Sequence, residues 1–105
     1  MSAKKQYSKT SDITKVIFRK EKTKPYEVFA LFPEIPGSVS AHTCLSYQHV
    51  GQHSAAEYNH CIRTSRPAKP EEYKALKKEL EQIGYVLDIR SRSGRRDYQT
   101  RKESL

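Results

Sequence analysis

The sequence has only two cysteines, Cys44 and Cys61, in 105 residues. So few cysteines exclude a disulfide-stapled scaffold, and we expect both to be reduced. No run approaches the roughly 18 apolar residues that a membrane-spanning helix needs. The basic start, residues 1–9, is not followed by the apolar segment of a secretory signal. We therefore expect a cytoplasmic protein with no membrane partner.

Familiar catalytic and cofactor motifs are missing as well. The chain has no nucleophile elbow, phosphate-binding loop, zinc-protease motif or dinucleotide fingerprint. Between residues 25 and 62 only Glu27, Glu34 and Glu57 carry a carboxylate, which leaves little for paired acid–base catalysis. We therefore expect a protein that is not an enzyme and that holds no cofactor.

A cysteine nucleophile would need a neighbouring base that lowers the pKa of the thiol. His60 precedes Cys61 in the sequence, but adjacent side chains on a helix point apart. A pair brought together by the fold, such as Cys44 with His53, stays open as an alternative.

Positive charge is absent from the middle of the chain. Residues 25–62 contain no Lys or Arg, whereas residues 1–24 carry eight and residues 89–105 carry six. The net charge of +8 therefore lies mainly at the two ends. A positive balance favours contact with polyanions, either nucleic acid (DNA or RNA) or an acidic protein. Plain solubility is the alternative reading of the same charge.

Runs of strand-forming residues, separated by Pro and Gly, predict a small sheet. The segment 26–32 is nearly all apolar, so we expect both of its faces to be covered. Together with 13–19 it should form an antiparallel hairpin. In the third strand, alternation puts Leu45 and Tyr47 on the core face. The expected strands are 13–19, 26–32, 41–50 and 85–90.

One helix is strongly indicated near the end of the chain. Apolar residues recur at helical spacing from Tyr73 to Ile83. Pro70 suits the first position of a helix, and Gly84 suits the position after its end. We therefore predict a helix over 70–83.

A second, shorter helix is predicted from a capping pattern. Ser54 and Glu57 are spaced as in a capping box, which indicates a helix over about 55–62. Together the elements indicate an α+β fold. We expect a small antiparallel sheet of three to four strands, with the main helix packed on one face and the short helix beside it.

The polar ends of the chain suggest how it is divided. One hundred and five residues suit a single domain, and apolar residues are scarce at both ends. We expect a disordered basic N-terminal tail over 1–12 and a single α+β domain over 13–91. A flexible basic C-terminal tail should then cover 92–105.

All four histidines and both cysteines lie in the segment that lacks Lys and Arg. Imidazole and thiolate are the ligands that zinc prefers, and a tetrahedral site needs four of them. The spacing contains no C-x-x-C pair, and Gly51 separates His49 from His53. We therefore rank a metal site below histidines that are hydrogen-bonded or exposed. The candidate ligands are His42, Cys44, His49, His53, His60 and Cys61.

Two parts of the chain are suited to nucleic acid. Residues 46–60 are dense in amide, aromatic and imidazole side chains, which can contact single strands, although such groups can also satisfy one another. Arginines after residue 89 suit the phosphate backbone, and Tyr98 could stack. We predict a small basic nucleic-acid-binding accessory protein. Its expected contacts are Tyr47, His49, Gln52, His53, Tyr58, Arg90, Arg92, Arg95 and Arg96.

Three segments carry a resemblance to known sequences: 28–37 (VFALFPEIPG), 47–54 (YQHVGQHS) and 66–85. With these the chain resembles a family of small uncharacterised proteins of bacterial mobile elements and phages. The resemblance covers about residues 13–92, and Lys69 stands where the motif has a Thr-like helix cap. It implies a bacterial, intracellular setting and brings no function with it.

Two alternatives to nucleic-acid binding follow from the same observations. The resemblance favours a protein-interaction or inhibitor module of a mobile element or phage that acts on a host system, with the basic ends docked on an acidic protein. The histidines and cysteines favour a metal-binding domain.

Overall fold

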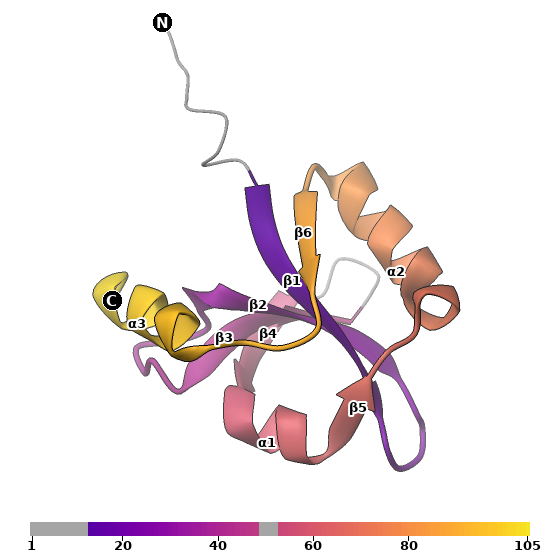
Figure 1. The fold of residues 1–105 in the computed structure, drawn as a ribbon, viewed down its shortest axis with the longest axis horizontal. Helices are drawn as coiled ribbons and strands as arrows, with labels where there is room; N and C mark the ends of the chain where they lie inside the picture. Colours follow the sequence, from indigo (N-terminus) through magenta and orange to yellow (C-terminus); the bar gives the residue numbers. More distant parts are fainter. Residues whose placement is uncertain (1–12, 49–52) are drawn as a thin grey trace, which may run out of the picture.

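The computed structural model of the chain describes residues 13–48 and 53–105 (Figure 1). In this part of the chain the strands are β1 (Ile13–Glu21), β2 (Val28–Pro36), β3 (Thr43–Tyr47), β4 (His53–Glu57), β5 (Ser65–Pro67) and β6 (Val86–Arg90). The helices are α1 (Tyr58–Arg63), α2 (Pro70–Ile83) and α3 (Arg95–Glu103). The α+β class is therefore confirmed, with more strands than the three to four predicted.

The strands form one curled sheet in which β1 has the most partners (Figure 1). The order is β4-β3-β2-β1-β5, and β6 also pairs with β1. The predicted hairpin is confirmed, because β1 and β2 run antiparallel with Ile17 opposite Leu31. Along its other edge β1 pairs with β5 near Arg19 and with β6 near Ile13. β6 runs parallel to β1, whereas the sequence predicted a wholly antiparallel sheet.

Buried side chains lie on both faces of this sheet, because successive residues of a strand point to opposite sides. The group under α2 consists of Val16, Phe18, Ala30, Phe32, Tyr47, Leu76 and Leu80. The group on the other face consists of Ile17, Phe29, Leu31 and Cys44, and α1 packs against it through Tyr58, Cys61 and Ile62. The prediction that both faces of β2 are covered is therefore confirmed.

Helix α2 has the bounds predicted from its apolar spacing. Leu76 and Leu80 are buried against the sheet, and burying each contributes about 1.5–3 kcal/mol. Gly84 ends the helix with a φ of 128°, a conformation that glycine adopts without steric cost. Among the described residues, α2 and the other helices are all too short and too polar to cross a bilayer.

The predicted helix over 55–62 is wrong in its first half. Residues 53–57 form β4 instead, which pairs with β3 so that Leu45 lies opposite Ala55. Glu57 does cap a helix, but as the residue before α1: its side chain accepts a hydrogen bond of 2.6 Å from the amide of His60. A short strand, β5, follows α1 and is not among the expected strands.

The C-terminal segment also differs from its prediction as a flexible tail. Residues 95–103 form α3, which packs against β2 (Figure 1). The helix buries two charged side chains, Asp97 and Arg101, which are only 4% and 3% exposed. Apolar periodicity is absent here, so the sequence pattern did not indicate a packed helix. Polar contacts hold α3 in place, and they also shape the candidate site.

Candidate nucleic-acid interface

A pocket of about 350 Å³ lies between α3, the start of α1 and the residue that precedes β3. Three elements distant in sequence supply its wall, because α3 packs beside β2 and next to the β4–α1 junction. The lining residues are His42, Tyr58, Asn59, Ser93, Gly94, Arg95, Tyr98 and Arg101. The wall thus combines cations, aromatic rings and hydrogen-bonding groups, and it contains no carboxylate.

Arg101 is the central buried cation of this pocket. Its Nε donates to the carbonyl of Ala41 at 2.8 Å, and its Nη1 donates to the carbonyl of Pro33 at 2.6 Å. The rings of Tyr58 and Tyr98 lie 5.4 and 5.6 Å from the guanidinium carbon, within the range of cation–π attraction. Across residues 13–48 and 53–105, Arg101 has no carboxylate within ion-pair distance, so its charge is not neutralised by the protein.

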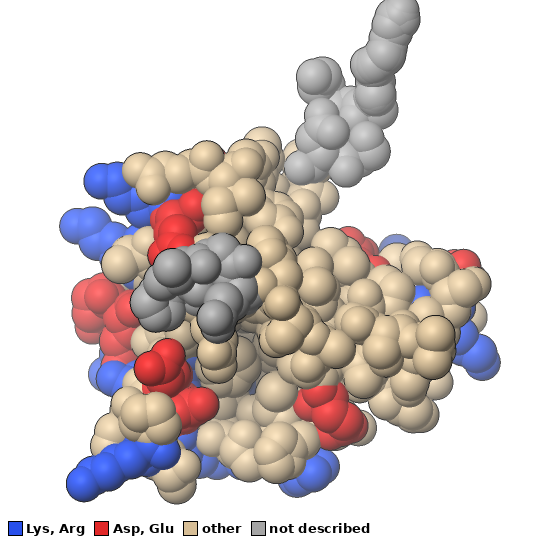
Figure 2. Space-filling model, turned by 180° about the vertical axis from the view of Figure 1, so that it is seen from behind, with Lys and Arg blue, Asp and Glu red and all other residues tan. Residues whose placement is uncertain are grey.

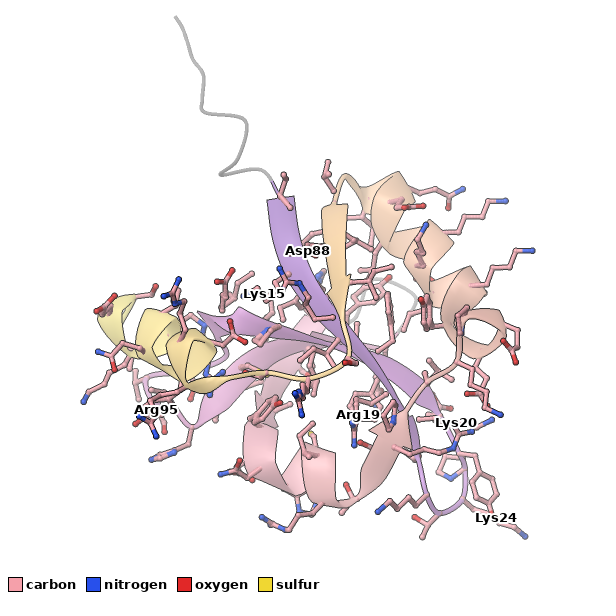
Figure 3. The ribbon with its side chains drawn as sticks, viewed as in Figure 1. Lys15, Arg19, Lys20, Lys24, Asp88 and Arg95 are labelled. Carbon is pink, nitrogen blue, oxygen red and sulfur yellow. The ribbon has the colours of Figure 1, made fainter. Side chains whose placement is uncertain are left out.

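Asp97 lies one helical turn before Arg101 on α3, but its carboxylate is bound by other groups. It accepts hydrogen bonds from Lys15 Nζ at 2.8 Å, from Ser93 Oγ at 2.9 Å and from the amide of Gly94 at 3.1 Å. Burial raises the pKa of Asp97, but these hydrogen bonds outweigh burial, so its pKa lies below the ordinary value. Asp97 therefore stays ionised, fixes the start of α3 and stabilises the ammonium of Lys15. Figure 3 labels Lys15 on β1.

Exposed cations lie just before α3, in its first turn and near its end, and one of them, Arg95, lines the pocket. Arg92, Arg95, Arg96 and Lys102 are exposed. None of the four makes an ion pair with any residue whose position the structure describes. Figure 3 places Arg95 at the start of α3, on the same side of the molecule as the pocket that it lines. These four side chains are therefore available to phosphates.

Arg90 behaves differently from the other arginines predicted to bind nucleic acid. It lies on β6 and holds Asp88 with two nitrogens, at distances of 2.9–3.1 Å. The pair lowers the pKa of Asp88 through the Arg90 hydrogen bond and raises the pKa of Arg90 through the Asp88 hydrogen bond. The charge of Arg90 is thus locally neutralised, which makes it a poorer phosphate contact than Arg95.

Aromatic and amide groups occupy the open side of the pocket. The ring of exposed His42 lies 5.7 Å from that of Tyr98, with a tilt of 37° between them. The hydroxyl of Tyr58 accepts a hydrogen bond of 3.2 Å from the amide of Ser93, which anchors the segment before α3 to α1. Asn59 is exposed on the rim.

The residues predicted from 46–60 do not converge on this pocket. Tyr47 is fully buried under α2, where its hydroxyl donates to Glu79, so the prediction that Tyr47 contacts a partner is wrong. His53 is exposed, but its Nε2 lies 2.9 Å from the hydroxyl of Tyr85, and its ring packs on Tyr47. His49 and Gln52 lie outside the described residues. Tyr58 is the one predicted contact from 46–60 that lines the pocket.

Sequence reasoning named Tyr98 as a stacking residue and counted Asn59 among the hydrogen-bonding side chains of 46–60, but it missed Ser93 as a contributor to the site. One signal could have grouped Tyr98 with Arg101: the two are three residues apart and thus share one helical face. No local pattern places His42 beside them, because this contact depends on how α3 docks.

The proposed metal ligands are scattered. Across residues 13–48 and 53–105, no three His, Cys, Asp or Glu side chains lie close enough to hold an ion. Burial raises the pKa of Cys44 to about 12 and also raises the pKa of Cys61, so both thiols are neutral at physiological pH. A neutral thiol is a poor nucleophile, which removes support from the Cys44–His53 alternative as well.

Comparison with protein-family models, curated proteins and solved structures finds no match to this chain.

Proposed function

We propose that this protein is a small, non-enzymatic nucleic-acid-binding accessory protein, and that α3 and the pocket beside it form the binding surface. The observation that carries the proposal is the exposed, unpaired basic group on and just before α3, one member of which, Arg95, lines a pocket whose wall has no carboxylate. The group consists of Arg92, Arg95, Arg96 and Lys102. Phosphates are the partner that such unpaired cations favour, because binding releases the counterions condensed on nucleic acid.

The distribution of charge over the rest of the surface disfavours the β3–β4 face as a binding side. Seen from behind, the middle of the surface is covered mostly by uncharged residues and a few Asp and Glu, while Lys and Arg lie at both margins (Figure 2). β3 carries no charged residue, and β4 carries only Glu57. A polyanion would therefore be steered away from the β3–β4 face and toward the basic margins. The resemblance to proteins of bacterial mobile elements is compatible with this role.

A fluorescence-anisotropy titration at several salt concentrations tests the proposal. We expect binding of labelled DNA or RNA that strengthens as salt is lowered. The triple variant R92A/R95A/R96A should bind at least about tenfold more weakly, and the slope of log K against log[salt] should shrink by about 2–3 on duplex DNA. The control is K24A/K74A/K78A, which removes the same charge from exposed positions elsewhere.

The two variants give distinct outcomes. Similar losses in both would mean that net charge alone drives binding, and the assignment to α3 would be rejected. Absence of binding to any nucleic acid at low ionic strength would reject the function itself.

A protein-interaction module is the second candidate, and the β4 edge favours it. β4 pairs with β3 on one side, and no strand among the described residues pairs with its other side. Its exposed residues include Ser54 and Ala55, and it lacks the Lys and Pro that commonly block an edge strand. A pull-down from bacterial lysate with nuclease treatment separates the candidates, because only a direct protein partner survives the nuclease.

A further inference from the structure

We propose that the pocket beside α3 holds one unpaired nucleotide, so that the protein prefers single-stranded nucleic acid to a duplex. This inference rests on the proposed function and specifies the ligand of the same site. It follows from three properties of the pocket: an uncompensated buried cation, aromatic rings at the opening, and a size that suits a small ligand.

The buried cation provides the attraction for a phosphate. Arg101 is only 3% exposed, and it forms part of the pocket wall. Its Nε and Nη1 are used by backbone carbonyls, whereas Nη2 makes no hydrogen bond within the described part of the chain. A positive charge with water largely excluded attracts an anion more strongly than an exposed one does. Arg95 adds a second charge at the rim.

The rings provide the attraction for a base. His42 and Tyr98 line the pocket with their rings 5.7 Å apart, and the ring of Tyr58, which also lines it, lies near the Arg101 guanidinium as that of Tyr98 does. Nucleobases stack on such side chains irrespective of sequence. Asn59 and Ser93 add donors and acceptors that can meet the edge of a base. Cation, ring and amide together suit a nucleotide better than a bare anion.

The size of the pocket limits what can enter. A volume of about 350 Å³ lies at the small end of ligand pockets and suits one nucleotide. A base in a duplex is stacked and paired, so it could enter only after flipping out of the helix. A single strand needs no such opening. Arg92 and Arg96 are exposed and lie within three residues of Arg95 in the sequence, which makes them the candidates to hold the neighbouring phosphates.

The experiment compares a single strand and a duplex of equal length by anisotropy at one salt concentration. We expect the single strand to bind at least about tenfold more tightly. H42A and N59A should each weaken single-strand binding about threefold to tenfold and leave duplex binding unchanged. H60A is the matched control, because His60 is also exposed but lies outside this pocket. Circular dichroism checks that each variant is folded.

Amide NMR spectra provide a second readout that does not depend on a variant. Addition of an oligothymidylate should shift the resonances of Ser93 and Gly94 more than those of α2. Free nucleoside monophosphates at millimolar concentration should compete with the strand, whereas nucleosides that lack the phosphate should compete less.

The outcomes separate this inference from the proposed function. If no nucleic acid binds, both are wrong. If duplex and single strand bind equally and H42A behaves like H60A, while R92A/R95A/R96A still loses affinity, the function stands and the nucleotide pocket is rejected. If the protein bound a phosphopeptide but no oligonucleotide, the nucleotide pocket would also be rejected.

Discussion

The Lys15 ammonium lies 2.8 Å from the Asp97 carboxylate, so residues 82 positions apart join the first strand to the last helix. Lys15 also lies 3.4 Å from Glu34 on β2. The Asp97 hydrogen bond outweighs burial and raises the pKa of Lys15. This pair connects the framework of the sheet with the helix that carries the candidate site.

We expect D97N to lower the free energy of unfolding by about 1–3 kcal/mol, because it removes a charged acceptor that Lys15, Ser93 and the Gly94 amide share. Urea unfolding measures this change, and a double-mutant cycle with K15M isolates the pair. The exposed Lys77–Glu81 pair is the control, where K77M should cost less than about 0.5 kcal/mol. Equal losses for K15M and K77M would contradict a structural role for the Lys15–Asp97 pair.

Arg101 should be important for stability as well as for binding. R101M removes the hydrogen bonds to the carbonyls of Ala41 and Pro33 and leaves both acceptors without this donor, so we expect a loss of about 1–3 kcal/mol in unfolding free energy. K102A is the matched control, because Lys102 is the exposed neighbour and should change stability by less than about 0.5 kcal/mol. Hydrogen exchange should show faster opening of α3 in R101M; unchanged protection would contradict the docking role.

Gly37 lies where a β-carbon cannot fit. A β-carbon there would lie 2.6 Å from the carbonyl oxygen of Cys44 and 2.8 Å from the Cα of Ala55, both of them backbone atoms. G37A should therefore lower unfolding free energy by about 1–3 kcal/mol. The control is V39A in the same loop, because Val39 is 93% exposed. A G37A protein as stable as V39A would show that this loop and β4 separate easily.

Glu72 should make stability depend on pH. Its carboxylate holds Arg66 at 2.6 and 2.9 Å and accepts from the Lys69 amide, and these contacts place its pKa well below the ordinary value, the Arg66 hydrogen bond contributing most. Because the pKa of Glu72 is lower in the folded than in the unfolded protein, the ionised carboxylate stabilises the fold at pH values above the unfolded pKa of about 4.3. This contribution to the unfolding free energy is lost as the pH falls from there toward the folded pKa.

Chemical unfolding of the wild type and E72Q at neutral and acidic pH measures this effect. The wild type should be the more stable at neutral pH, and the difference should shrink between about pH 5 and pH 2. E71Q is the control from the same turn, because Glu71 is exposed and makes no ion pair in the described part of the chain. A difference between wild type and E72Q that stays constant with pH would contradict the assignment.

The parts of the fold that the sequence predicted are those with strong local patterns. The apolar spacing in α2 and the β1–β2 hairpin needed no information about distant contacts. β4 was mistaken for helix because Ser54 and Glu57 match a capping box, whereas pairing with β3 decides the conformation of that segment. A local helix signal is therefore weak evidence for a segment that can pair with a neighbouring strand of a sheet.

The candidate site was harder to predict than the fold. Arginines near residue 95 were correctly identified as basic and available, but α3 was read as a tail because its only large nonpolar side chain is that of Tyr98. The docking of α3 depends on buried polar contacts, those of Asp97 with Lys15 and of Arg101 with backbone carbonyls. Such contacts leave no periodic pattern of apolar residues in the sequence. The sequence predicted Tyr47 both as a core residue and as a contact for nucleic acid. The packing of α2 on the sheet makes it a core residue.

The central position of β1 has a consequence for protein synthesis. β1 is made early, yet two of its neighbours, β5 and β6, and the ion partner of Lys15 on α3 are made later. A nascent chain can form the β1–β2 hairpin, but the other edge of β1 stays unpaired until β5 and β6 have been made. Helix α3, which presents Arg95 and Arg96, follows β6 in the chain, so its ion pair with Lys15 can form only after every strand of the sheet has been made.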